Sequence, residues 1–332
     1  NNRVPWSGHM ASYAIRDIYQ KIKKSSLTIV FVNTRAQAEL VFNKLWQEND
    51  NNLRIAIHHG SLEKEIRRKV ESLMSLGKID CVVATSSLDL GIDWGDVDLV
   101  VQIGSPKGIS RFLQRIGRSN HRFDEPSNAL LVPSNRFEYL ECLSAINSIK
   151  NKILDETKEK KGSLDVLAQH ILGVACSDPF HVDDLYNQVI NAWPYRHLTK
   201  PKFFEVLEFV KNGGYSLKHY EQYSKIGLNK DKFYAIKNKS IRNRYRLNVG
   251  TIVESYMLKV KLGNRTLGQV EEWFIEGLNE GDTFLFSGRI LEYQTISNNN
   301  VIVKSTSHKQ PKIPSYAGGR LPLSTELSIE AV

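Results

Sequence analysis

The chain has 332 residues, in which 45 lysines and arginines outnumber 36 aspartates and glutamates, for a formal charge of +9. This length allows two or three domains with cores of their own, and the basic balance favours a polyanionic partner. Cys81, Cys142 and Cys176 lack the spacing of zinc ligands or of a disulfide framework, so no metal site is expected and a reducing, cytoplasmic setting fits best. No apolar run is long enough to cross a bilayer, so no membrane contact is expected.

Residues 1–150 alternate the signals of strands and helices. Continuous apolar, β-branched runs predict five strands, at residues 27–32, 55–57, 79–84, 99–103 and 129–132. Apolar residues at helical spacing predict helices at residues 36–49 and 62–76, with Ser61 as the N-cap of the second. The alternation predicts a doubly wound α/β domain with a parallel sheet. Ligands of such sheets bind beyond the carboxyl ends of the strands, which here lead into loops at Asn33, Gly60, Thr85 and Ser105.

Two smaller domains are expected after a charged linker at residues 151–162. Residues 163–246 have the outline of a winged helix: three helices, at 164–175, 185–192 and 200–211, and then a polar, aromatic-rich hairpin at 215–245. Residues 247–332 read as the start of a small β-barrel or sandwich, with strands at 251–253, 258–262, 267–270, 283–286, 290–293 and 301–303. The Pro- and Gly-rich stretch at 311–323 is expected to be a connector, and we expect both ends of the chain to be cut.

Four short blocks in the first 150 residues carry chemistry. Residues 114–122 read QRIGRSNHR, and three arginines so close together suit concentrated negative charge, because the guanidinium fork matches phosphate oxygens. Residues 83–93 read VATSSLDLGID and follow a predicted strand. Earlier blocks read FVNTR at residues 31–35 and HHGSL at residues 58–62.

In this order and spacing the blocks resemble motifs IV, V and VI of superfamily 2 helicases. Further phrases at residues 102–108, 281–289 and 314–324 extend the resemblance over nearly the whole chain, to the Lhr group and especially its ligase-associated DExH-box branch. The resemblance implies a second RecA-like domain at residues 1–150, then a winged helix and a truncated β-barrel. No phosphate loop and no DExH box occur in the sequence, so the first RecA-like domain is expected to be missing.

The implied function is that of a fragment of an ATP-dependent DNA helicase that translocates 3′ to 5′ on single-stranded DNA. Its implied cofactors are ATP and Mg²⁺, held mainly by the missing RecA-like domain in cis, and its partner is single-stranded or tailed duplex DNA. The chain alone is predicted not to hydrolyse ATP. Two alternatives stay open: a non-catalytic nucleic-acid-binding fragment of a split or degenerate helicase, and an RNA-directed helicase.

The resemblance also assigns roles to single residues around ATP. Arg118 matches the arginine finger that reaches the γ-phosphate, and Gln114 matches a residue that orients the nucleotide or the finger. The position of a usual second arginine holds His121, so either His121 or the adjacent Arg122 takes that place. Three more residues are cofactor-binding candidates: Gly91, Asp93 and Arg115. Capping of a helix or turn is the alternative role for Asp93.

Nucleic-acid contacts are expected from hydroxyl, amide and basic groups that follow the strands, at Asn33, Thr34, Arg35, Gly60, Ser61, Thr85 and Ser86. Capping of the following helices is the alternative role for these residues. A second basic surface is expected at residues 225–246, where eight lysines and arginines, among them Arg242 and Arg244, are interleaved with aromatic residues. The aromatic residues could instead form the core face of the wing.

Four further side chains are expected to have structural roles. His58 and His59 have no metal-binding partners at suitable spacing, so a loop role or a hydrogen-bonding role is expected in place of metal ligation. Trp193 and Trp273 are expected in the core, with a role as platforms on which bases stack as the alternative.

Overall fold

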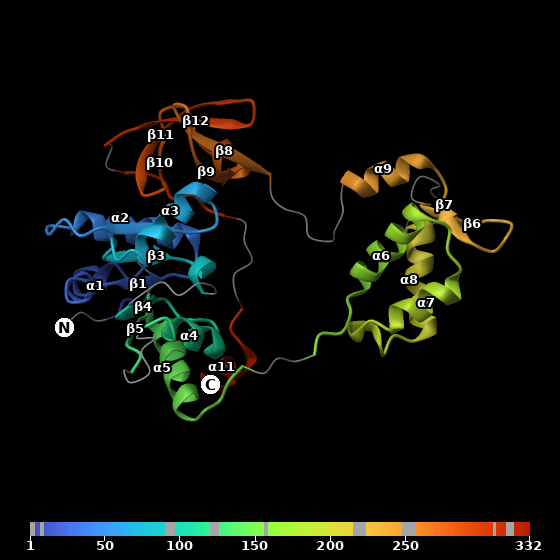
Figure 1. Cartoon of the computed structure of the whole chain (residues 1–332), viewed down its shortest axis with the longest axis horizontal. Helices are drawn as coiled ribbons and strands as arrows, with labels where there is room; N and C mark the ends of the chain where they lie inside the picture. The colour runs from blue at the N-terminus through green and yellow to red at the C-terminus, as the bar shows by residue number, and fades with distance from the viewer. Residues whose placement is uncertain are drawn as a thin grey trace. The chain divides into compact units, whose positions relative to one another are not determined.

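The computed structural model describes all residues except 1–3, 7–9, 90–96, 120–125, 156–158, 215–223, 248–255, 308–309 and 317–321. The chain forms two compact units (Figure 1): Asn1–Glu156 together with Ser255–Val332, and Thr157–Glu254. The second unit is therefore an insertion into the chain of the first. In the described part of the chain no helix is long and apolar enough to span a membrane, and the three cysteines are free and buried.

A five-stranded parallel sheet forms the centre of the first unit (Figure 1). Its strand order is β2-β3-β1-β4-β5, with β1 Thr28–Phe31, β2 Ile55–His58, β3 Cys81–Ala84, β4 Leu99–Ile103 and β5 Ala129–Val132. Every residue of β1 and β3 is buried, which explains their continuous apolar sequence. The predicted doubly wound parallel sheet is confirmed.

Helices cover both faces of this sheet. Successive side chains of a strand point to opposite faces, so a continuously apolar strand has an apolar surface on each face to bury. Val30 packs into a core with α1 and α2, whereas Ile29 and Phe31 pack into a core with α3. The helices of this domain are α1 Ile15–Ile22, α2 Arg35–Gln47, α3 Lys64–Ser75, α4 Ile109–Ile116 and α5 Arg136–Lys150, with 3₁₀ turns η1 Ser12–Ala14 and η2 Ser86–Leu88. The prediction that Ser61 caps α3 is wrong: α3 begins after Glu63, and the Ser61 hydroxyl accepts a hydrogen bond from Arg35.

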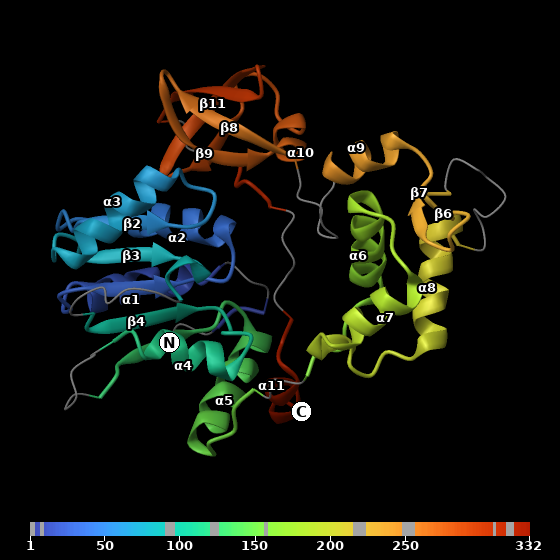
Figure 2. The same cartoon turned by 45° about the vertical axis from the view of Figure 1, so that its right-hand side comes forward.

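A second, curled sheet belongs to the same unit and lies over α2 and α3 (Figures 1 and 2). Its strand order is β10-β11-β12-β8-β9, with only the β12–β8 pair parallel. Its elements are β8 Met257–Leu262, β9 Arg265–Glu271, α10 Glu272–Glu276, β10 Thr283–Phe286, β11 Arg289–Ser297 and β12 Asn300–Ser305. The strand expected at 251–253 lies outside the described residues. Lys312, in the expected connector, forms a β-bridge with Phe284, and the last helix, α11 Thr325–Glu330, packs on α5.

A buried carboxylate joins the second sheet to the first domain. Glu39 on α2 has no exposed surface, and it accepts hydrogen bonds from the backbone N–H groups of Ser287 (2.5 Å) and Gly288 (2.8 Å) in the β10–β11 turn. The backbone N–H of Ser61 donates to His59 Nδ1, so His59 Nε2 carries a proton and donates to Glu39 Oε1 at 3.1 Å. Glu39 therefore accepts three hydrogen bonds from two distant parts of the chain.

The second unit contains α6 Leu164–Ser177, α7 Val182–Ile190, η3 Trp193–Tyr195, α8 Lys200–Asn212, β6 Ile226–Leu228, β7 Tyr234–Ile236 and α9 Lys239–Leu247. The hairpin β6–β7 is shorter than predicted, because the stretch from Lys239 onward is helical. The Asn238 side chain accepts from the Ile241 N–H near the start of α9, and Ile241 and Tyr245, one turn apart, both pack into the core of this unit. Arg242 and Arg244 consequently lie on a helix and not on the wing.

Candidate nucleotide and nucleic-acid site

The centre of the candidate nucleotide site is a buried ion pair between two of the sequence blocks. Arg115 on α4 is 1% exposed, and its Nε and Nη2 atoms donate to the two carboxylate oxygens of Asp89 at 2.8 and 3.2 Å. Its Nη1 atom donates to Gln102 Oε1 at 2.6 Å, and its guanidinium lies 4.8 Å from the centroid of the Phe31 ring. This arrangement favours a positioning role for Arg115 over the direct cofactor contact expected from the sequence.

Arg118 lies in the turn that ends α4 and is partly buried. Its backbone N–H donates to the carbonyl oxygen of Arg115, and its Nη2 atom donates to the carbonyl oxygen of Asp89, both at 3.0 Å. Gln114 is exposed on α4, and Arg111, 33% exposed, has its Nε atom 3.8 Å from Asp89 Oδ2. Three arginines, Arg111, Arg115 and Arg118, thus surround the buried Asp89.

Four residues named for this site lie outside the described residues: Gly91, Asp93, His121 and Arg122. Their roles, and the choice between His121 and Arg122, stay predictions.

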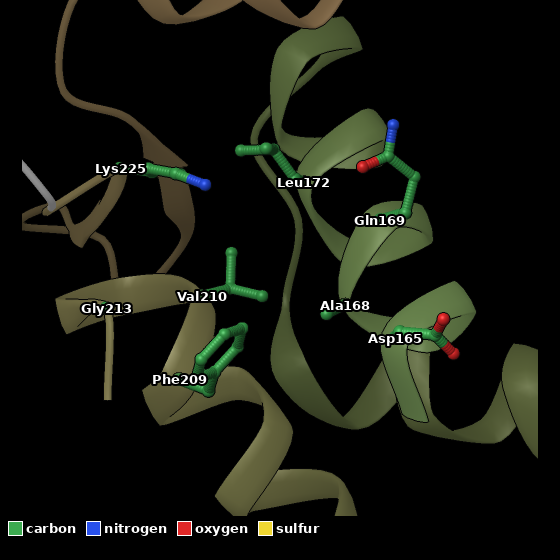
Figure 3. Close-up of a pocket in the computed structure, with 8 residues that line it drawn as sticks. All are labelled: Asp165, Ala168, Gln169, Leu172, Phe209, Val210, Gly213 and Lys225. Carbon is green, nitrogen blue, oxygen red and sulfur yellow. The ribbon is translucent and has the colours of Figure 1, made fainter. Parts of the chain in front are cut away.

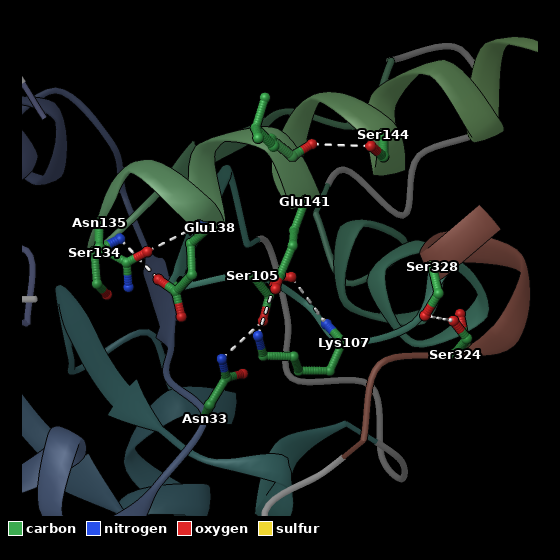
Figure 4. Close-up of polar contacts among 12 residues, drawn as sticks. Asn33, Ser105, Lys107, Ser134, Asn135, Glu138, Glu141, Ser144, Ser324 and Ser328 are labelled. Carbon is green, nitrogen blue, oxygen red and sulfur yellow. Dashed lines mark hydrogen bonds and ion pairs between the residues drawn. The ribbon is translucent and has the colours of Figure 1, made fainter. Parts of the chain in front are cut away.

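The amino end of α4 is held by a network of polar contacts, part of which is drawn in Figure 4. Asp155 Oδ2 accepts from the Ser110 N–H at 2.7 Å; burial alone would raise the pKa of Asp155, but hydrogen bonds to Ser324 and to the first backbone N–H groups of α4 lower it. Lys107, just before α4, pairs with Glu141 of α5 at 2.6 Å (Figure 4). The Lys107 carbonyl oxygen also accepts from the Ser324 N–H at 2.9 Å. The segment that leads into α11 therefore contacts the start of α4.

Seven of the residues predicted to bind nucleic acid follow the carboxyl ends of β1, β2 and β3. Arg35 is the first residue of α2 and Ser86 the first residue of η2, and the other five lie in the loops between strand and helix. The Thr34 hydroxyl caps α2 by accepting from the Gln37 N–H, and Asn33 Nδ2 donates to the Ser105 carbonyl oxygen at 2.7 Å (Figure 4). Arg35 Nη1 donates to Ser61 Oγ at 2.8 Å, so two of the predicted residues meet directly.

The other three predicted residues that follow these strands differ in exposure. Gly60 and Ser86 are exposed, whereas Thr85 is 7% exposed. A contact between the Thr85 side chain and a strand phosphate would need a local change, so Gly60 and Ser86 are the more accessible of the three.

The two histidines make hydrogen bonds, as predicted. His58 is 1% exposed and joins Ser87 Oγ (Nδ1, 2.8 Å) to Glu71 Oε1 (Nε2, 3.0 Å). Burial lowers the pKa of His58, against the opposing effect of Glu71. Among the described residues no group of three or more His, Cys, Asp or Glu side chains is placed to hold a metal ion.

Helix α9 carries four of the eight lysines and arginines of the predicted basic surface, and the other four precede it in the chain. Arg244 and Arg246 are exposed there, and Arg242 is partly buried. Two of the interleaved aromatic residues, Tyr234 and Tyr245, pack on the core, and Tyr234 stacks on Phe180 with ring centroids 5.8 Å apart, whereas Phe233 is exposed.

The two tryptophans expected in the core are instead on the surface, which corrects the prediction. Trp193 is 68% exposed and Trp273 is 46% exposed. Arg196 covers the Trp193 ring at 3.5 Å from its centroid. An indole shielded by a guanidinium needs less burial, and the sequence pattern does not show this pairing.

A groove of about 300 Å³ lies between α6 and α8 of the second unit (Figure 3). Apolar side chains such as Leu172 and Phe209 line it together with Asp165 and Lys225. Of the residues predicted to contact nucleic acid, Lys225, at the start of the basic stretch 225–246, lines this groove, and the residues predicted around ATP do not.

Two family models match consecutive parts of the chain. The helicase conserved C-terminal domain matches residues 12–123, and the winged helix domain of large helicase-related protein matches residues 147–313. The chain belongs to the Lhr helicase family. The predicted membership of the Lhr group, as the C-terminal part of a superfamily 2 helicase core, is confirmed, and the narrower ligase-associated branch stays a prediction.

Individual members of the Lhr family match over most of the chain. The ATP-dependent helicase Lhr-Core of Methanocaldococcus jannaschii is 36% identical over 309 residues, 93% of this chain and 36% of that protein. Its counterpart in Methanothermobacter thermautotrophicus is 37% identical over 323 residues, 96% of this chain and 37% of that protein. The Mycobacterium smegmatis helicase Lhr bound to ssDNA and AMP-PNP is 28% identical, with a TM-score of 0.63 over 77% of this chain and 34% of that one. The chain thus spans little more than a third of these Lhr relatives.

Proposed function

We propose that the chain is part of an ATP-dependent DNA helicase and translocase that moves 3′ to 5′ on single-stranded DNA. In the intact protein, a first RecA-like domain in cis holds most of the ATP, and this chain supplies Arg118 as the arginine finger. The proposal rests on one observation above all: the buried Arg115–Asp89 pair holds the turn of α4 that presents Arg118. The Lhr relative that was solved with ssDNA and AMP-PNP supports ATP and DNA as the ligands.

The proposed chemistry is phosphoryl transfer from ATP to water. As the bond to the γ-phosphate breaks, negative charge spreads over its equatorial oxygens, and a fixed guanidinium stabilises that charge. Arg118 is suited to this role because its backbone and its side chain are both tied to the Asp89–Arg115 pair. We assign no Mg²⁺ ligand to the described residues near Arg118, because the Asp89 carboxylate is already bridged to Arg115.

Two surfaces are proposed to contact the DNA. The segments that follow the carboxyl ends of β1–β3 offer Asn33, Gly60 and Ser86, whose amide, backbone and hydroxyl groups suit strand phosphates. In the second unit, Arg244 and its neighbours on α9 add positive charge that neutralises phosphates without reading sequence. Because both surfaces suit the backbone, competition between matched DNA and RNA single strands is the assay that separates a DNA motor from an RNA motor.

The decisive test is the substitution Arg118→Ala in the intact protein, with Arg68→Ala, an exposed arginine on α3, as the matched control. Arg118→Ala is expected to lower DNA-stimulated ATP turnover by about 10³-fold or more while the Kd for single-stranded DNA stays within about twofold. Arg68→Ala should leave both quantities unchanged. Normal turnover in Arg118→Ala would remove Arg118 from the chemistry. Turnover by the 332-residue chain alone, unaffected by Arg118→Ala, would contradict the proposed division of the site.

A further inference from the structure

We propose that Asp89 is a positioning residue that sets the place of Arg118 and couples the segment after β3 to α4. This inference rests on the proposed function, because it requires Arg118 to act on ATP. Asp89 itself is 6% exposed and, in this role, touches neither ATP nor the attacking water.

The first step is the division of labour within Asp89. Its carboxylate accepts two hydrogen bonds from Arg115, and its carbonyl oxygen accepts one from Arg118 Nη2. One residue therefore holds two arginines of the same sequence block through different atoms. A displacement of Asp89 would move both guanidinium groups together.

The second step is the position of Arg115. A buried guanidinium that loses its carboxylate is strongly unfavourable, because its charge is then poorly compensated. The Gln102 amide and the Phe31 ring would remain as partners, and neither carries a negative charge. Without the Asp89 carboxylate, α4 must shift to hydrate Arg115. The Arg118 backbone would shift too, because its N–H is bonded to the Arg115 carbonyl oxygen.

The third step separates positioning from mere stabilisation. The Arg54–Asp80 pair has the same two-pronged geometry, with Nε–Oδ2 at 3.0 Å and Nη2–Oδ1 at 2.6 Å, but it joins the start of β2 to the start of β3. That is the opposite end of these strands from the proposed site. The Arg54 side chain is 54% exposed against 1% for Arg115. Asp80→Asn therefore controls for the loss of a carboxylate from a two-pronged pair remote from the site, and hydrogen exchange controls for the greater burial of the Asp89–Arg115 pair.

The experiment measures steady-state ATP turnover of the intact protein with Asp89→Asn, Asp80→Asn, Arg118→Ala and the double variant Asp89→Asn/Arg118→Ala. Asp89→Asn is expected to lower kcat about 10- to 100-fold, as for a reacting group displaced by about 1 Å, with the KM for ATP and the Kd for DNA within about twofold. Asp80→Asn should change kcat by less than about twofold. The double variant should be no slower than Arg118→Ala, because Asp89 acts through Arg118.

Hydrogen exchange of the 332-residue chain supplies a readout that does not depend on turnover. In Asp89→Asn, the peptide that covers residues 113–119 should exchange faster, with the peptides of the second sheet unchanged; Asp80→Asn should leave residues 113–119 as in the parent.

Four results would overturn the inference: normal kcat in Asp89→Asn, unchanged exchange at residues 113–119, a double variant much slower than Arg118→Ala, or a loss of kcat matched by faster exchange throughout the unit. Normal kcat in Arg118→Ala would instead overturn the proposed function and the inference with it. A low kcat in Arg118→Ala beside a normal kcat in Asp89→Asn would overturn the inference alone.

Discussion

Replacement of Glu39 by glutamine tests whether the second sheet is held to the first domain by a buried carboxylate. Glutamine keeps the size of the side chain but replaces one acceptor oxygen with an NH₂ group. That group must face at least one donor among the Ser287 N–H, the Gly288 N–H and His59 Nε2–H. One hydrogen bond to a charged acceptor is lost, and a buried donor is left without a partner.

The expected cost follows from these two losses. A hydrogen bond to a charged group contributes about 1.5–3 kcal/mol, and an unsatisfied buried donor costs about 1–3 kcal/mol. Some relaxation of the β10–β11 turn will recover part of this, so we expect Glu39→Gln to destabilise the junction by about 3 kcal/mol. That corresponds to roughly a hundredfold in the opening equilibrium constant.

Hydrogen exchange followed by mass spectrometry measures this opening directly at the peptide that contains Ser287 and Gly288. The control is Glu65→Gln, which replaces an exposed carboxylate on α3. It should change the free energy of opening at the same peptide by less than about 0.5 kcal/mol. If the two variants protect this peptide equally well, the Glu39 carboxylate does not hold the junction and the reasoning fails.

Four other predictions address different parts of the chain. Burial lowers the pKa of His58 below its ordinary value of 6.5, so as the pH falls the unfolded chain binds the proton before the folded chain does. The stability of the first unit should therefore fall as the pH drops below about 6.5. An equally steep fall of stability with pH in His58→Gln would refute this. A Cβ at Gly268 would lie 2.1 Å from the Ser61 carbonyl oxygen, so Gly268→Ala should lower the free energy of unfolding by about 3 kcal/mol. The control Gly263→Ala, where φ is +57° and no atom lies within 4 Å of the added Cβ, should lower it by about 1 kcal/mol. Equal melting temperatures of the two variants would contradict the predicted clash. Leu327→Asp, at a fully buried position on α11, should speed hydrogen exchange in α4 and α5, and unchanged exchange there would show that α11 does not brace them. Arg244→Glu should weaken single-stranded DNA binding about tenfold at low salt and flatten its salt dependence, and an unchanged Kd would remove α9 from the DNA surface.

The first domain was predictable because its signals are local. Strands such as β1 and β3 are buried on both faces and are therefore continuously apolar in sequence, and the loops that follow them occupy one edge of the sheet by topology alone. Helix α9 was missed because it is highly charged, and only Ile241 and Tyr245 turn toward the core. A short basic segment with two apolar residues four positions apart carries too little pattern to separate a helix from a hairpin.

The arrangement of the candidate site was less predictable, because its contacts join residues that are far apart in the chain. Asp89 and Arg115 stand in different sequence blocks, 26 positions apart, and nothing in either block indicates that they pair. Glu39 and Ser287 are 248 positions apart, and an isolated acidic residue within a helix normally reads as exposed. The arginine cluster therefore predicts that the chain binds phosphate. Which arginine is buried and which is exposed to a ligand can be read only from the three-dimensional structure.

The insertion of Thr157–Glu254 into the first unit has a practical consequence for dissecting the protein. A truncation after residue 246, at the end of the predicted winged helix, would remove the second sheet and strip Glu39 of the Ser287 and Gly288 donors. Excision of residues 157–254 and their replacement by a flexible Gly/Ser bridge would instead retain both hydrogen bonds from Ser287 and Gly288 to Glu39. In this chain the middle is the separable part, and the two ends must be kept together.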